Sequence, residues 1–152
     1  MTRAILRSDG GARGNPGPAG AGFIIEADGA IICAAGRFLG EVTNNVAEYQ
    51  ALIWGLENVK ALGYSEVAVF ADSELLVKQI TGHYKVKNAG LKPLFGRALG
   101  LLREFERFEI LHVRREENMA ADAMANAAMD EKSTVGTPAC DPGGRSAQGS
   151  LF

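Results

Sequence analysis

Two apolar runs, residues 20–27 and 30–39, are separated only by Asp28-Gly29. An Asp-Gly pair between two strand-like runs is typical of a two-residue hairpin turn, because its backbone twist matches that of antiparallel strands. A third strand-like run covers residues 3–9, before a Gly/Pro-rich loop at residues 10–18. The chain is therefore predicted to begin with a three-stranded antiparallel meander.

Helical and strand patterns alternate after the meander. Thr43 is a favourable N-cap for a helix whose apolar residues recur up to Leu62-Gly63, and Asn118 is expected to cap a final helix ending near Glu131. Pro93 is tolerated in the first turn of a helix. The predicted elements are helix 43–62, strand 66–71, helix 73–80, helix 89–105, strand 108–113 and helix 118–131.

This order predicts an α/β fold. Right-handed crossovers would place the fourth and fifth strands parallel beside the first, giving a mixed five-stranded sheet with helices on both faces. Ligand sites in such sheets lie at the carboxyl ends of the strands that flank the point where strand order reverses. Asp9 ends the first strand and Asp72 follows the fourth, so both acids are expected at that edge.

Length and composition fit one domain with a tail. With 152 residues and 47% hydrophobic content, we expect one core over residues 1–131 and a C-terminal tail over 132–152. Residues 133–152 include eleven Gly, Pro, Ser or Thr, so the tail is expected to be disordered or docked, for example through Leu151 and Phe152. Cys33 and Cys140 have neither metal-ligand spacing nor the density of a disulfide scaffold.

Bulk properties predict a soluble, cytoplasmic, monomeric protein. No run approaches the roughly 20 apolar residues of a membrane helix, and no secretion signal is recognisable. The net charge of -2 argues mildly against a nucleic-acid partner. From Lys78 to Arg115, however, nine basic residues stand against three acidic ones. A solvated helix face is the simpler interpretation of this run by itself.

Four carboxylates form the strongest functional pattern: Asp9, Glu48, Asp72 and Asp122. Each alone has an ordinary explanation as a turn, helix-surface or capping residue. Together they fall at one predicted edge of the sheet, where crowded carboxylates would repel unless a multivalent cation neutralised them. Oxygen ligands suit magnesium or manganese, and two such ions about 4 Å apart support phosphodiester hydrolysis.

The surrounding motifs carry a family resemblance. In chain order they are residues 8–12 (SDGGA) with 14–18 (GNPGP), 43–48 (TNNVAE), Asp72-Ser73, and 115–118 (REEN) followed by Asp122. From about residue 3 to residue 129 the chain resembles the type 1 ribonuclease H family. The first two motif groups are specific signals, whereas Asp72-Ser73 alone is weak. The predicted order of strands and helices agrees with that family's fold.

The resemblance implies an endonuclease that cuts the RNA strand of RNA–DNA hybrids and leaves 5′-phosphate and 3′-hydroxyl ends. It implies two Mg²⁺ ions, replaceable by Mn²⁺, held by the four acids. It also implies that Asn15, Asn45 and main-chain groups around Gly11 and Ala12 contact 2′-hydroxyls, which distinguish RNA from DNA. The alternative is that Asn15 and Asn45 are only turn and helix-start residues.

The chain departs from the family at several positions. The family's loop histidine before the last acid is absent, and His112 is expected in a strand on a sheet face or in the core. Arg115 or Arg114 would then contact phosphate instead. Glu74 replaces a substrate-contacting glutamine and would either repel phosphate or join the metal site. Arg7 shares a strand face with the first acid and would neutralise the acid cluster.

Residues 82–88 (GHYKVKN) replace a longer basic protrusion found in relatives. Tyr84, Lys85 and Lys87 would offer one stacking surface and two phosphate contacts, unless the segment is a plain loop between helices. Trp54 is expected in the core. A binding protein without nuclease activity and a DNA-cutting nuclease are the competing functions. Four clustered acids argue against the first and the asparagine motifs against the second, while cleavage of double-stranded RNA is left open.

Overall fold

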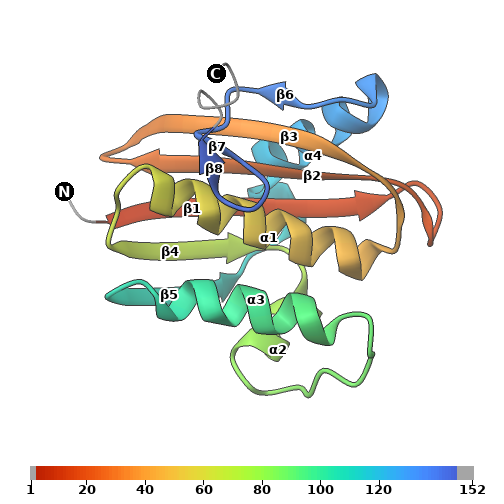
Figure 1. The fold of residues 1–152 in the computed structure, drawn as a ribbon, viewed down its shortest axis with the longest axis horizontal. Coiled ribbons are helices and arrows are strands. Elements are labelled where there is room, and N and C mark those ends of the chain that lie inside the picture. Colours follow the sequence, from red (N-terminus) through yellow and green to blue (C-terminus); the bar gives the residue numbers. More distant parts are fainter. Residues whose placement is uncertain (1–2, 147–152) are drawn as a thin grey trace.

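The computed structural model describes residues 3–146. A mixed sheet has α1 and α3 on one face and α4 on the other (Figure 1). The elements are β1 (Arg3–Ala12), β2 (Gly17–Ala27), β3 (Ala30–Val42), α1 (Asn44–Ala61), β4 (Glu66–Ala71), α2 (Glu74–Ile80), α3 (Lys92–Arg103), β5 (Arg107–His112), the 3₁₀ turn η1 (Arg115–Glu117), α4 (Met119–Glu131), β6 (Val135–Gly136), β7 (Cys140–Asp141) and β8 (Arg145–Ser146).

The predicted α/β class and strand arrangement are confirmed. The sheet order is β5-β4-β1-β2-β3-β6, with β1 antiparallel to β2 and parallel to β4. The predicted five strands are one too few, because β6 adds a two-residue pairing to the edge of β3. Such a short pairing shows no alternation of polar and apolar residues, so no sequence pattern marks it.

The meander is longer than predicted. The ladder between β1 and β2 continues past Asp9 through Gly10, Gly11 and Ala12, and the loop expected at residues 10–18 shrinks to residues 13–16. Glycine-rich strand ends lack the side-chain alternation on which the prediction depended. The amide of Arg13 donates to the carbonyl of Pro18 at 2.8 Å and closes the shortened loop.

Two glycines let the helices approach the central strands. A Cβ added at Gly10 would lie 2.2 Å from the Ala47 carbonyl oxygen of α1, and one at Gly22 would lie 2.4 Å from the Ala121 carbonyl oxygen of α4. No larger residue fits at either position without moving a helix. Because Ala47 and Ala121 directly precede Glu48 and Asp122, this packing brings both acids toward the sheet.

Helix starts agree with the sequence except at two places. Thr43 caps α1 by accepting from the Val46 amide, as predicted. Helix α3 begins at Lys92 rather than residue 89. Asn118 does not cap α4 with its side chain; its Nδ2 donates to the Ser8 carbonyl of β1 at 2.8 Å. The residue is buried beneath the helix, so its amide meets the sheet instead of the helix amides.

A C-terminal strap, defined as residues 133–146, follows α4 and passes β3 to lie against α1 (Figure 1). It is held mainly through its backbone. Trp54 Nε1 donates to the Cys140 carbonyl at 3.0 Å, and Asn58 Oδ1 accepts from the Ala139 and Cys140 amides at 2.6 and 3.1 Å. Glu57 Oε1 accepts from the Gly143 amide at 3.1 Å. The strap therefore docks without a large apolar surface.

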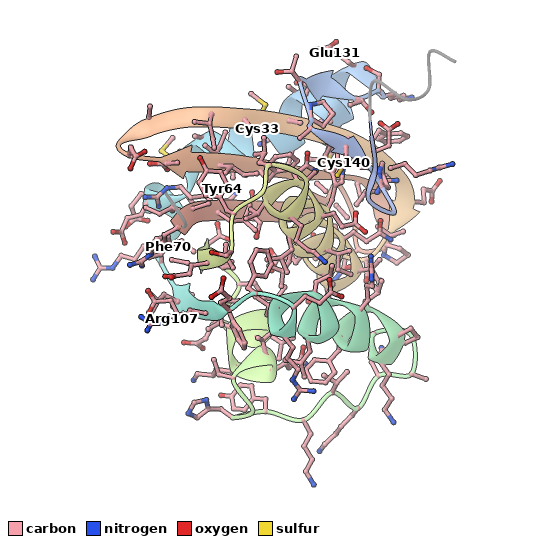
Figure 2. The ribbon with its side chains drawn as sticks, turned by 60° about the vertical axis from the view of Figure 1, so that its left-hand side comes forward. Cys33, Tyr64, Phe70, Arg107, Glu131 and Cys140 are labelled. Atoms are coloured by element: carbon pink, nitrogen blue, oxygen red, sulfur yellow. The ribbon has the colours of Figure 1, made fainter. Side chains whose placement is uncertain are left out.

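Trp54 and both cysteines are buried in the structure. Trp54 is buried and meets Phe23 edge to face, so it belongs to the core as predicted. Cys33 and Cys140, labelled in Figure 2, are free and buried. Leu151 and Phe152 lie outside the described residues. Across residues 3–146, no helix is both long and apolar enough to span a membrane.

Replacing Asn58 tests how much the docked strap contributes to the stability of the fold. Asn58→Ala leaves the buried Cys140 amide and the part-buried Ala139 amide without an acceptor, so we expect the free energy of unfolding to fall by roughly 2–3 kcal/mol and the Tm by roughly 5–10 °C. Denaturant and thermal unfolding measure the change. Lys60→Ala is the control on the same helix, because it removes only the exposed Lys60–Glu104 ion pair, worth under about 1 kcal/mol. Equal losses in the two variants would contradict a contribution from the strap.

Candidate active site

Three acids meet where β1 and β4 lie side by side. Asp9 is in β1 and Asp72 directly follows β4, and the parallel register pairs Ser8 with Ala71, so the two acids are neighbours. Glu48 reaches them from the second turn of α1. One carboxylate oxygen from each of Asp9, Glu48 and Asp72 lies within 4.8 Å of the other two. The predicted meeting of these residues at one edge of the sheet is present in the fold.

Asp122 reaches the site from the opposite face. It projects from the first turn of α4, lies close enough to Asp9 to help raise the pKa of that acid, and lies outside the group of three acids that share the 4.8 Å limit. Its Oδ1 is 3.9 Å from Arg115 Nη2, and its Oδ2 accepts from Asn126 Nδ2 at 3.1 Å.

Burial and mutual repulsion control the charge of the cluster. Burial, the hydrogen bond with Asp122, and repulsion from Asp72, Glu48 and Asp122 raise the pKa of Asp9 from 3.8 to about 9. Burial raises the pKa of Glu48 from 4.5 to about 7, opposed by a hydrogen bond from Ser73 and aided by repulsion from Asp72. The cluster thus favours protons, or another cation, over the fully ionised state.

This donor set fits divalent cations. The three convergent carboxylates offer only oxygen ligands, which hard ions such as Mg²⁺ prefer, and their spacing allows one ion to touch all three. A cation would remove the repulsion that raises the pKa of Asp9. Above the acids lies an open cavity of about 490 Å³. It is lined by Asp9, Gly10, Gly11, Ala12, Arg13, Asn44, Glu48, Asp72, Arg115, Asp122, Ala125, Asn126 and Met129.

Asn44 organises the cavity wall near the expected RNA contacts, and sequence reasoning missed it. Its side-chain Oδ1 accepts a hydrogen bond from the backbone amide of Ala12 at 2.8 Å. Its backbone amide donates to Asn15 Oδ1 at 3.0 Å. The Ala12 amide is therefore already engaged, while Gly11 and Ala12 still line the cavity. Through its bond with the Asn44 amide, Asn15 joins the hairpin loop to the start of α1.

The other predicted substrate residues lie around the cavity rather than in it. Asn45 is exposed and borders a shallow hollow next to Glu48 and Ser73. Glu74 is exposed, lies 3.9 Å from Lys78 and does not line the acidic cavity. Tyr84, Lys85 and Lys87 are exposed on the loop between α2 and α3. The ammonium of Lys78 sits 5.0 Å from the centre of the Tyr84 ring.

Three basic residues were predicted near the acids or the substrate, and they lie in different places: Arg115, His112 and Arg7. Arg115 lines the cavity with a side chain that is 80% exposed. His112 ends β5 and is exposed outside the cavity lining, so it is not a core residue. Arg7 pairs with Glu26 at 2.7 Å and stacks on Phe70, which corrects the expectation that it neutralises the acid cluster. Arg13 and Asn126 also line the cavity, and no local motif marked them.

Comparisons with known proteins identify relatives over most of the chain. The family model described as "Reverse transcriptase-like" matches residues 7–128. A bifunctional protein of Mycobacterium tuberculosis is 42% identical over 142 residues, covering 92% of this chain and 39% of that protein. The chain therefore spans about two fifths of the length of that relative. The ribonuclease HI of Halobacterium salinarum is 42% identical over 124 residues, and the chain spans 62% of its length.

Solved structures show the same fold. The RNase H1 of Halobacterium salinarum has a TM-score of 0.83 and 41% identity, covering 85% of this chain and 98% of that one. LC11-RNase H1, solved in complex with an RNA/DNA hybrid, has a TM-score of 0.81 and 42% identity, with coverage of 85% and 98%. Sequence motifs, sheet order and relatives agree, and the chain belongs to the type 1 ribonuclease H family.

Proposed function

We propose that this protein is an endoribonuclease that hydrolyses the RNA strand of RNA–DNA hybrids. The observation that carries the proposal is the convergence of Asp9, Glu48 and Asp72 within 4.8 Å, beside Asp122 in an open cavity. The hybrid-bound relative LC11-RNase H1 supports the choice of substrate. The products would be 5′-phosphate and 3′-hydroxyl ends.

The four acids would hold two divalent cations, Mg²⁺ or in its place Mn²⁺. When bound, such ions activate water and stabilise the leaving oxygen of a phosphodiester. The chain's own residues prepare this arrangement. Ser73 caps α2 through its hydroxyl oxygen and donates to Glu48, which helps to keep Glu48 ionised. Asp9 must lose its proton as a cation binds, so protons and cations compete for it.

Substrate contacts would surround the acids. Gly11, Ala12, Asn15 and Asn45 would contact the RNA strand and recognise its 2′-hydroxyls; of these, Gly11 and Ala12 line the cavity. Across the α2–α3 loop, Tyr84, Lys85 and Lys87 would contact the DNA strand. Glu74 would face phosphate beside Lys78, which reduces the repulsion. A monomeric, cytoplasmic enzyme stays a prediction of the sequence.

Asp9→Asn should abolish cleavage, because the amide removes one negative ligand from the centre of the cluster. We expect the loss to exceed 100-fold, an order typical of removing a group essential to catalysis. The assay incubates the protein and Mg²⁺ with labelled RNA–DNA hybrid, double-stranded RNA and duplex DNA. Glu106→Gln is the matched control, because Glu106 is an exposed acid that does not line the cavity. Equal cutting of duplex DNA would favour the DNA-nuclease alternative, and binding without cutting would favour a binding protein.

The acid cluster should also make metal-free stability depend on pH. Both raised pKa values, about 9 for Asp9 and about 7 for Glu48, exceed the unfolded values. The folded state therefore binds more protons than the unfolded state between about pH 4 and 9, and stability falls as pH rises through this window. In EDTA, Asp9→Asn should melt roughly 3–6 °C above wild type at pH 8 and much closer to it at pH 5.

Saturating Mg²⁺ at pH 8 should raise the Tm of wild type and reverse this order, since the cation binds the ionised cluster. Differential scanning fluorimetry at both pH values measures all four conditions. In EDTA, the Tm difference between Asp9→Asn and wild type could instead stay constant from pH 5 to pH 8. That result would contradict the raised pKa of Asp9 in the folded state.

Two residues are candidates to replace the family's missing loop histidine, Arg115 and His112. Arg115 lines the cavity whereas His112 does not, so Arg115→Ala should lower kcat roughly 10-fold or more, in the range for lost stabilising donors. His112→Ala should change kcat by less than about 2-fold. Steady-state cleavage of a defined hybrid gives both numbers, and the opposite ranking would refute the role of Arg115.

A further inference from the structure

A chain of polar contacts connects Asp122 to the hairpin loop between β1 and β2. Asn126 Nδ2 donates to Asp122 Oδ2 and to the Asp122 carbonyl, both at 3.1 Å. Arg13 Nη2 donates to Asn126 Oδ1 at 3.4 Å and pairs with Asp130 Oδ1 at 2.8 Å. We name Arg13, Asn126 and Asp130 the tether. Arg13 and Asn126 line the same cavity as Asp122.

Asp122 has more need of such support than the other acids. Asp9 and Asp72 are fixed by neighbouring strands, and Glu48 receives a hydrogen bond from Ser73. Asp122 comes from the opposite face of the sheet, with a 28% exposed side chain outside the three-acid group. Its other oxygen is 3.9 Å from the highly exposed Arg115, beyond hydrogen-bond distance. Besides its neighbour Asp9, the Asp122 carboxylate has Asn126 as a close hydrogen-bond donor, at 3.1 Å.

Donor and acceptor chemistry determines how the tether is arranged. A guanidinium carries only donors, so Arg13 requires the oxygen of the Asn126 amide to face it. The amide nitrogen then faces Asp122, where it can only donate. Asp130 holds Arg13 in this position from one turn further along α4. Reversing the amide would place two acceptors against each other at Asp122.

The exposure of the outer pair argues against a role in folding. The side chains of Arg13 and Asp130 are 48% and 66% exposed, and such pairs contribute about 0–1 kcal/mol to stability. We propose that Asn126, oriented by Arg13 and Asp130, is a positioning residue that fixes the Asp122 carboxylate for cation binding. This inference rests on the proposed function. Loss of partners that orient metal ligands typically lowers metal affinity or activity about 10–100-fold.

The test compares wild type with Asn126→Ala and Asn126→Gln. Gln keeps a donor that can reach an acid four residues away on a helix. Mn²⁺ binding is followed by calorimetry and by the Mn²⁺-induced rise in Tm, and cleavage of the hybrid gives kcat and KM. Glu131→Ala is the control on the same helix; Glu131 is exposed at the end of α4 (Figure 2).

For Asn126→Ala we expect an unchanged Tm in EDTA, Mn²⁺ affinity lowered about 10-fold or more, and kcat lowered with KM for the hybrid nearly constant. Asn126→Gln should recover part of both losses, and Glu131→Ala should match wild type. Arg13→Ala should shift Mn²⁺ affinity in the same direction by a smaller factor. If Asn126→Ala fails to fold, Asn126→Gln and Arg13→Ala carry the test, since both retain the helix.

Unchanged Mn²⁺ affinity and kcat in Asn126→Ala would overturn the inference. So would an Arg13→Ala variant that raises only KM, because Arg13 would then be a substrate contact. Failure of the proposed function is distinguishable: wild type would bind Mn²⁺ but leave the hybrid uncut. In that case the calorimetric comparison of the variants still decides whether the tether positions Asp122.

Discussion

Close packing of two helix backbones against β1 and β2 is the constraint on which the site depends. Gly10 admits the carbonyl of Ala47 and Gly22 admits that of Ala121, at distances that no Cβ could tolerate. Gly22 also pairs with Asp9 in the ladder. The two helices thus converge on Asp9 from opposite faces of the sheet. Hydrophobic burial supplies the force that keeps them there, since α1 alone buries Tyr49, Leu52, Trp54 and Leu56.

That packing works against electrostatics. Burial and repulsion raise the pKa values of Asp9 and Glu48, so the metal-free fold carries an unfavourable interaction that the core must offset. The same repulsion would favour a bound cation in the proposed site. A cluster that repels its own charges would gain most from a small, highly charged ion and would release protons as that ion bound. The stability of the core and the chemistry of the site are therefore coupled through Asp9.

The sequence predicted what periodic patterns and local turns encode. Strands β1 to β5, the hairpin at Asp28-Gly29 and the Thr43 cap followed from alternation and capping preferences within a few residues. The ladder through Gly10 and Gly11 did not, because glycine has no side chain to alternate. The Asn118 bond to Ser8 joins residues 110 positions apart, and no local pattern distinguishes it from a cap. The cavity-lining roles of Asn44 and Asn126 were missed for the same reason.

The C-terminal strap links the two helices that carry Glu48 and Asp122. It starts at α4, which bears Asp122, pairs with the edge of β3, and ends on Trp54, Glu57 and Asn58 of α1, the helix that bears Glu48. The two acid-bearing helices are thereby joined around the edge of the sheet as well as through its core. Because strap contacts involve backbone groups, they place few demands on side chains, and a segment rich in glycine and proline can make them. Its composition, from which a disordered or docked tail was predicted, is compatible with a segment that must turn sharply to follow the surface of another helix.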